Sequence, residues 1–255
     1  MDKKKKKRIV IVIVAAVLAV LLAVAGVVIA SRYFPLFAPR VVEPVESIPE
    51  SAPDPEPIAN PIDFAALQAT NPDTVAWIRI PGTSIDYFVM RTGEDKVEDY
   101  YLRRNVNGKK ATAGCIYMQK YNRADFSDPN TVLYGHNMRN GTMFADLHKL
   151  EDADFFENNQ YIFIYTPGHI LTYQIVSAFL HNAKHLLMSY DFEAPNERAA
   201  YAQMILDPPE KTIRHVREGV EVTGNDHLLT LSTCYRGNDG RYLVVAKLIS
   251  DQPTL

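Results

Sequence analysis

The sequence predicts a mainly β domain, a barrel or a sandwich, behind a single N-terminal transmembrane helix. Two patterns support this prediction. Ile9–Ala30 is one uninterrupted apolar run, and after Ile62 short β-prone runs alternate with Gly, Pro, Asn and Asp. With 255 residues, 47% of them hydrophobic and 22% charged, the chain has room for one sizeable domain or two small ones, and this ordinary globular composition names no function.

The first 30 residues have the features of a membrane anchor. Residues 1–8 carry six basic side chains against Asp2, a net charge of +5. Ile9–Ala30 has no charge and would span about 33 Å as a helix, enough to cross a bilayer core. Basic residues on this flank predict a cytoplasmic N-terminus and a domain outside the cell, in a single-pass protein of the cell membrane. The alternative is a signal peptide cleaved after Val28-Ile29-Ala30, although the apolar region of such peptides is usually only about 7–15 residues long.

Residues 31–62 are predicted to form an extended acidic linker. Eight prolines lie between Pro35 and Pro61, interleaved with acidic residues and almost no aromatic ones. This stalk would hold residues 63–255 away from the bilayer. The whole chain carries −3 and its first eight residues +5, so the part after the anchor carries −8. Because a nucleic-acid-binding domain concentrates positive charge, we exclude nucleic acid as a partner.

Seven β-prone runs are the predicted strands: Val75–Ile80, Gly114–Met118, Thr131–Tyr134, Tyr161–Tyr165, Leu171–Phe179, His227–Thr233 and Tyr242–Leu248. Two segments, Ile80-Pro81-Gly82-Thr83 and Thr166-Pro167-Gly168-His169, are predicted to be turns. Seven or eight short strands are typical of a barrel or a sandwich.

Two segments are predicted to be helices. Asp63–Ala69 is a short helix entered from a proline. Pro195–Leu206 is better marked, because proline suits the first helical position, Tyr201 and Ile205 fall on one face, and two prolines follow its end.

Cys234 is the candidate nucleophile. It is one of only two cysteines and ends the run Thr230-Leu231-Ser232-Thr233-Cys234, where a strand opens into a loop. A free thiol has a pKa near ~8.5, so a catalytic cysteine needs a neighbouring base or cation. Cys115 lies in an apolar strand, where a buried thiol acts as a small hydrophobic side chain. A Cys115–Cys234 disulfide is the alternative, because the predicted compartment is extracytoplasmic.

His136 is the best-placed base among the seven histidines, because it also follows an apolar strand and a glycine. His148 lies in a predicted helical segment. Any single histidine is more often a surface or core residue than a catalyst. His181 and His185 are four residues apart and would suit zinc only on a helix. Since no third ligand accompanies them, we predict no metal site.

An arginine is the third candidate group. Acyl transfer builds negative charge on a carbonyl oxygen, and a guanidinium can stabilise that charge. Arg241 begins the strand after Cys234 and returns beside it if the two strands pair. Arg236 lies in the intervening loop, where a solvated side chain is expected. We favour Arg241 and keep Arg236 as the alternative.

Together these segments resemble the sortases, the cysteine transpeptidases that attach proteins to the Gram-positive cell wall. Thr230–Cys234 matches the TLxTC motif of the family, and Arg241 matches the arginine that opens its next strand. Two further regions are similar to its histidine segment and its opening strands: Tyr134–Met138 with Gly141–Phe144, and Asn71–Thr83 with Ile85–Tyr87. The resemblance is greatest to class B, because of the serine in TLxTC, the predicted anchor and the helix at 195–206.

The resemblance implies an eight-stranded β-barrel with peripheral helices and no cofactor. It implies that Cys234 attacks a Thr-Gly or similar bond in a C-terminal sorting motif of a secreted protein. Arg241 would hold the oxyanion, and His136 would protonate the departing amine. An amine of a peptidoglycan precursor or a pilin lysine would then release the thioacyl enzyme. Tyr134 and Ser232 would line the substrate groove, the alternative being a core tyrosine and a strand serine.

Two rival functions stay open from the sequence. The first is an anchored cysteine protease that uses Cys234 and His136 with water as the acceptor. The second is a non-enzymatic surface binding domain that keeps the barrel fold.

Overall fold

The computed structural model describes residues 56–235 and 240–255. Several predicted features lie outside these residues: the basic segment 1–8, the anchor 9–30, most of the linker 31–62, and Arg236. Across the two described ranges, no helix is both long enough and apolar enough to cross a membrane.

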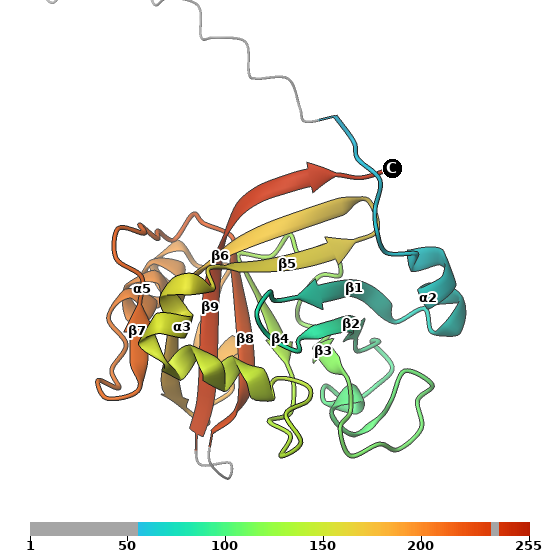
Figure 1. Cartoon of the computed structure of the whole chain (residues 1–255), viewed down its shortest axis with the longest axis horizontal. Coiled ribbons are helices and arrows are strands. Elements are labelled where there is room, and N and C mark those ends of the chain that lie inside the picture. The colour runs from blue at the N-terminus through green and yellow to red at the C-terminus, as the bar shows by residue number, and fades with distance from the viewer. Residues whose placement is uncertain (1–55, 236–239) are drawn as a thin grey trace, which may run out of the picture. The chain divides into compact units, whose positions relative to one another are not determined.

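Nine strands of the described chain form one sheet, and pairing of β5 with β6 closes eight of them into a barrel (Figure 1). The sheet order is β5-β1-β2-β3-β4-β8-β9-β6-β7, so β7 extends the edge of β6 outside the closed ring. The strands are β1 (Thr74–Arg79), β2 (Asp86–Arg91), β3 (Ile116–Met118), β4 (Asn130–Tyr134), β5 (Tyr161–Thr166), β6 (His169–Asn182), β7 (Arg214–Val216), β8 (Leu228–Tyr235) and β9 (Gly240–Pro253). The mainly β class and the eight-stranded barrel are confirmed.

All seven predicted strands are present, and two further ones were not predicted. β2 has a single pair of neighbouring buried residues, Val89 and Met90, so its sequence shows no alternation. β7 has only three residues, all half-buried. The predicted turn after Thr166 is confirmed, with Gly168 at φ +95°, a conformation that favours glycine.

Alternation along β8 assigns its side chains to two faces. Leu229 and Leu231 point into the barrel core, whereas Leu228 belongs to a second apolar cluster outside the barrel. Because side chains alternate along a strand, Ser232 and Cys234 share the outer face. The strand is buried on both faces, which holds the end of β8 in a fixed position.

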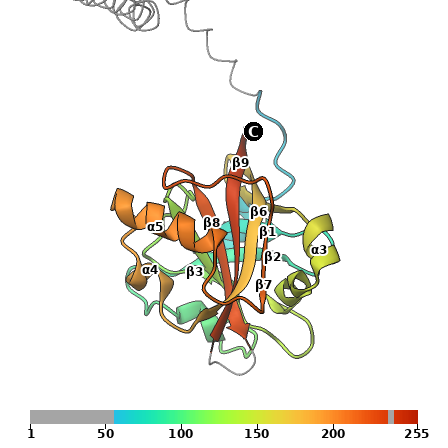
Figure 2. The same cartoon turned by 90° about the vertical axis from the view of Figure 1, so that its left-hand side faces the viewer.

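The helices lie around the barrel, with α4 and α5 on one side of it and α3 on the other (Figure 2). They are α2 (Phe64–Thr70), α3 (Ala153–Asn158), α4 (Leu186–Ser189), α5 (Pro195–Leu206), and the 3-10 helices η1 (Tyr100–Arg103) and η2 (Ala145–Glu151). Both predicted helices are confirmed as α2 and α5. α5 buries Tyr201 and Ile205, and the Tyr201 hydroxyl lies 2.9 Å from Thr230 Oγ1, so α5 packs on the outer face of β8.

The pairing of β4, β8 and β9 brings distant segments to one end of the barrel. β4 and β8 run parallel, with Tyr134 opposite Ser232, so both strands end at the same side. β9 returns antiparallel to β8 and places Arg241 opposite Cys234. His136, two residues beyond β4, therefore follows the strand end that lies beside the cysteine.

Candidate active site

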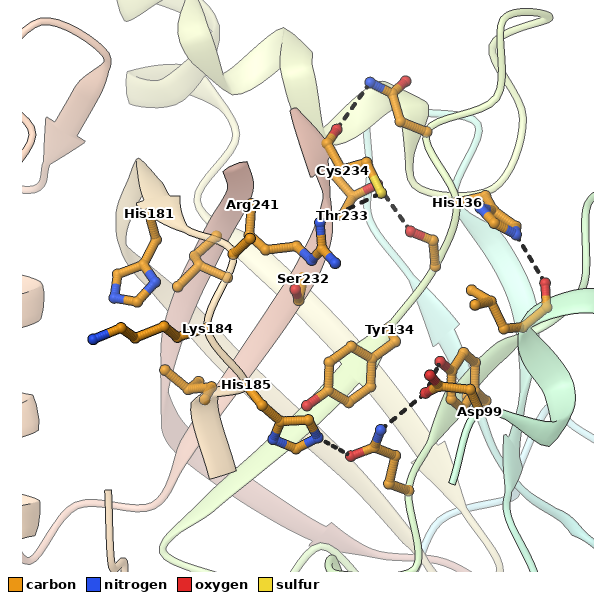
Figure 3. A pocket seen from close by; sticks show the side chains of 18 of the residues that line it. Asp99, Tyr134, His136, His181, Lys184, His185, Ser232, Thr233, Cys234 and Arg241 are labelled. Carbon is orange, nitrogen blue, oxygen red and sulfur yellow. Dashed lines mark hydrogen bonds between the residues drawn. The ribbon is translucent and has the colours of Figure 1, made fainter. Parts of the chain in front are cut away.

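Cys234 lies at the end of β8 and opens onto a cavity of about 800 Å³ on the outer face of the barrel (Figure 3). The cavity is lined by the ends of β4, β6 and β8, the beginning of β9, Tyr117 of β3, the segment between β2 and β3, and residues after β6. Its walls include every residue singled out from the sequence for catalysis or substrate binding that the structure describes: Tyr134, His136, Ser232, Cys234 and Arg241.

Cys115 has surroundings that suppress its reactivity. Its side chain is only 4% exposed, and burial raises the pKa of its thiol to about 12. Its sulfur also donates a hydrogen bond to Arg104 O at 3.2 Å. Both cysteines are free thiols, so the alternative Cys115–Cys234 disulfide is not formed. Cys234 is the partly exposed thiol of the two.

Arg241 faces the cysteine from the neighbouring strand. Cys234 and Arg241 are direct cross-strand partners, and Arg241 Nη1 lies 3.8 Å from Cys234 Sγ. The same nitrogen donates to Gly240 O at 3.2 Å, which orients the guanidinium toward the cavity, as Figure 3 shows. The antiparallel return of β9 thus brings back a residue that is seven positions away in the sequence.

The backbone is closely packed just beyond β4, and this packing positions His136. Gly135 N donates to Ser232 O at 3.2 Å, which continues the β4–β8 pairing. A Cβ atom on Gly135 would lie 2.5 Å from Ile116 Cδ1 and 2.7 Å from Phe144 Cδ2, so the chain needs glycine here. In the view of Figure 3, His136 and Arg241 flank Cys234.

The His136 ring has a defined hydrogen-bonding state. Its Nε2 lies 2.8 Å from Leu102 O, and because a carbonyl only accepts, Nε2 carries a proton. Nδ1 is therefore the nitrogen that can accept or release a proton. Burial is the largest influence on this ring and lowers the pKa of His136; the Leu102 hydrogen bond opposes the effect and the nearby charge of Arg103 adds to it. No hydrogen bond joins the ring to Cys234 in the described part of the chain.

Tyr134 and Ser232 both line the cavity, and each faces the other across the β4–β8 pair. The Tyr134 ring packs against Tyr117, with centroids 5.6 Å apart. Its hydroxyl is buried and has no hydrogen-bond partner among the described residues. Burial raises the pKa of Tyr134, so the hydroxyl stays protonated and can donate.

The floor of the cavity contains a polar network that the sequence analysis missed. Asp99 Oδ1 accepts from the Tyr117 hydroxyl at 2.8 Å and from Gln119 Nε2 at 3.0 Å. Gln119 Oε1 in turn lies 2.8 Å from His185 Nε2. No local pattern marks these residues, because three separate segments contribute them.

His181 and His185 both line this cavity. His181 is the second-last residue of β6, and its Nδ1 lies 3.1 Å from Asn182 O, whereas His185 precedes α4. The helix that a zinc pair would need is therefore absent at these two positions. The described ranges contain no group of three His, Cys, Asp or Glu side chains arranged to hold a metal ion.

A thiol that shares one cavity with an imidazole and a guanidinium, here on the outer face of a β-barrel, suits a cysteine-dependent acyl-transfer enzyme. The sortase domain family matches residues 78–249, and the chain belongs to this family of cysteine transpeptidases. Two curated relatives are both named sortase B. The protein from Listeria monocytogenes is 34% identical over 189 residues, covering 72% of this chain and 73% of the relative. The protein from Staphylococcus aureus is 31% identical over 189 residues, covering 73% and 74%.

The fold is similar to solved structures of the same name. The crystal structure of Clostridium perfringens sortase B aligns with a TM-score of 0.64 at 35% identity, covering 74% of this chain and all of that one, 100%. The two sequence relatives and this fold relative all carry the name sortase B.

Proposed function

We propose that this chain is a membrane-anchored class B sortase that cleaves a C-terminal sorting motif of secreted proteins. It would join the new carboxyl end to an amine of a peptidoglycan precursor or to a pilin lysine. The supporting observation is that Cys234 Sγ lies 3.8 Å from Arg241 Nη1 in a cavity that His136 also lines. The apolar segment Ile9–Ala30 and the acidic linker 31–62 would hold the catalytic domain, residues 63–255, outside the cell.

In the first half of the reaction, Cys234 Sγ adds to the carbonyl carbon of a Thr-Gly or similar bond while its proton passes to neutral His136. Arg241 donates hydrogen bonds to the oxyanion that forms. When the tetrahedral intermediate collapses, the carbon–nitrogen bond breaks and His136 returns its proton to the departing amine. The product is a thioester on Cys234.

In the second half, the acceptor amine attacks the thioester carbonyl and His136 takes a proton from the attacking nitrogen. The carbon–sulfur bond breaks, an amide forms and the proton returns to the sulfur. The lowered pKa of His136 favours a neutral ring at pH 7, which suits both proton acceptances. Nδ1 performs these transfers, because Nε2 is engaged by Leu102 O.

Tyr134 and Ser232 are proposed to contact the sorting motif. Both adjoin the proposed catalytic groups along the cavity wall, and Tyr134 offers a buried hydroxyl that has no partner among the described residues. A buried donor without a partner is unfavourable until a ligand accepts from it. A substrate carbonyl or amide oxygen would supply that acceptor.

The experiment uses the full-length chain, purified in mild detergent, with a pool of hexapeptides that contain a central Thr-Gly bond in varied flanking sequence. Triglycine or a diamino acid amide serves as the acceptor, and ligated product is measured by mass. We expect ligation that disappears in Cys234→Ala and persists in Cys115→Ala. If the peptide is cleaved equally fast with and without acceptor, and no ligated product forms, the protease function is favoured instead. Ligation that persists in Cys234→Ala would refute the nucleophile.

A further inference from the structure

His148 contacts the main chain of Cys234, the proposed nucleophile. Its Nε2 lies 3.2 Å from Cys234 O and 2.9 Å from Asn137 Nδ2, and Asn137 Nδ2 also donates to Cys234 O at 3.1 Å. Leu147 and Leu150, its neighbours on η2, pack into the barrel core. His148 is not among the residues that line the cavity, and its contact with Cys234 is to the backbone carbonyl.

The Glu151 carboxylate determines which ring nitrogen of His148 carries the proton. Its Oε1 lies 2.6 Å from His148 Nδ1, and because a carboxylate only accepts, Nδ1 carries the proton. In the neutral ring Nε2 is then an acceptor. The Asn137 amide has two N–H donors, which suit His148 Nε2 and Cys234 O at the same time. In this arrangement His148 Nε2 and Cys234 O are both acceptors, so the Asn137 amide, and not a direct hydrogen bond, links the His148 ring to the carbonyl of Cys234.

His148 also contacts β9, through Tyr242. The His148 ring stacks on Tyr242, with centroids 4.9 Å apart and planes inclined by 25°. Tyr242 is fully buried in the barrel core and directly follows Arg241. His148 therefore contacts one group beside each proposed catalytic residue: Asn137 after His136, the carbonyl of Cys234, and Tyr242 after Arg241.

We propose that His148, oriented by Glu151, is a positioning residue that holds His136, Cys234 and Arg241 in their relative places. This inference rests on the proposed function of that trio. The three residues come from separate strand ends, and His148 is one side chain that contacts all three ends. Catalytic groups displaced by about 1 Å can lose about 100-fold in rate, so a residue that fixes their backbones affects kcat without touching the substrate.

The test compares three variants of the full-length chain. His148→Ala removes the ring, and His148→Gln restores a hydrogen-bonding amide near the Nε2 position. The matched control is His215→Gln, because His215 also stacks on an aromatic ring, Phe156, and also bonds Glu151, through its carbonyl at 2.9 Å. We measure kcat and KM for ligation with the Thr-Gly peptides, the rate of Cys234 alkylation by iodoacetamide, and Tm.

We expect His148→Ala to lower kcat about 10- to 100-fold with KM within about twofold, and His148→Gln to recover to within about threefold of the parent. His215→Gln should keep the parental kcat. A His148→Ala variant with parental kcat and alkylation rate would overturn the proposal, whatever its Tm. Equal loss in His215→Gln would also overturn it, because the effect would then come from general disturbance of η2.

The alkylation rate separates this inference from the proposed function. If the parent ligates no peptide, the proposed function fails, while a changed rate of Cys234 alkylation in His148→Ala with recovery in His148→Gln still supports positioning. If the parent ligates peptide and neither kcat nor alkylation responds to His148, only the positioning role fails.

Discussion

Cys234 and Arg241 are direct partners across the antiparallel β8–β9 pair, with Arg241 Nη1 3.8 Å from Cys234 Sγ. Strand register, and not proximity along the chain, sets this distance. Because side chains directly opposite each other on a sheet point to the same face, both groups enter the same cavity. The pair therefore presents a sulfur and a cation to the same cavity.

Replacement of Arg241 tests its proposed role at the oxyanion. Arg241→Ala should lower kcat about 10²- to 10³-fold, the usual effect of removing an oxyanion donor. Arg241→Lys keeps the charge but loses the planar set of donors, so its kcat should fall between those of Ala and the parent. Steady-state ligation assays measure both variants. An Arg241→Ala variant with parental kcat would exclude this arginine from the reaction.

The pH dependence of the reaction should report the lowered pKa of His136. Because the neutral ring must accept a proton, kcat/KM should fall on the acidic side below the ordinary histidine value of about 6.5. Arg103→Ala removes a positive charge that lowers the pKa of His136, so this acidic limb should move to higher pH. Arg139→Ala, which also removes a cation from the cavity wall, is the control and should leave the limb in place.

The lowered pKa of His136 also makes the stability of the fold depend on pH. The folded-state pKa of His136 is depressed, so burial of its neutral ring contributes stability above the unfolded value of about 6.5 that is lost as the pH falls through the folded value. An NMR titration of His136 that gives a pKa above 6.5 in the parent would contradict both this pH dependence of stability and the expected rate profile.

Gly135→Ala tests whether the close packing around Gly135 positions His136. The added methyl group would meet Ile116 and the buried Phe144 ring, which should destabilise the fold by about 1–3 kcal/mol and displace His136. Gly141→Ala is a matched control: its φ of +79° disfavours alanine by about 1–2 kcal/mol, but open space surrounds it. Denaturant unfolding should show similar losses of stability, and ligation assays should show loss of kcat in Gly135→Ala alone. Equal losses of kcat in Gly135→Ala and Gly141→Ala would show that Gly135 does not position His136.

Thiol labelling should distinguish the two cysteines. Burial raises the pKa of Cys115 to about 12, so iodoacetamide at pH 8 should modify Cys234 and leave Cys115 until the protein unfolds in urea. Peptide mapping by mass spectrometry identifies the modified residue. Modification of Cys115 first, in the folded protein, would contradict the burial seen in the structure.

Much of the fold could be predicted from the sequence, because β-prone runs and glycine-proline turns are local signals. The strands near Cys234 and His136 were found in this way, whereas their parallel pairing, which brings both strand ends to one side, is seen only in the structure. β7 was missed because its three half-buried residues acquire strand geometry only by pairing with β6.

The polar network at the cavity floor and the contacts of His148 were not predicted, for a different physical reason. Asp99, Gln119 and His185 meet only after three loops fold over the outer face of the barrel. His148 was recognised only as part of a helical segment, and its contact with Cys234 O spans 86 positions of sequence. Such long-range contacts leave no periodic pattern in the sequence.

The most direct measurement of the central claim is the mass of the acyl-enzyme. The full-length chain is mixed with the Thr-Gly peptide pool without acceptor, quenched in acid, digested and mapped. We expect the peptide that contains Cys234 to gain the mass of the acyl fragment that ends in threonine. Triglycine added before the quench should remove this mass, and the peptide that contains Cys115 should stay unmodified. Ligated product formed without any adduct on Cys234, or with the adduct on Cys115, would contradict Cys234 as the nucleophile.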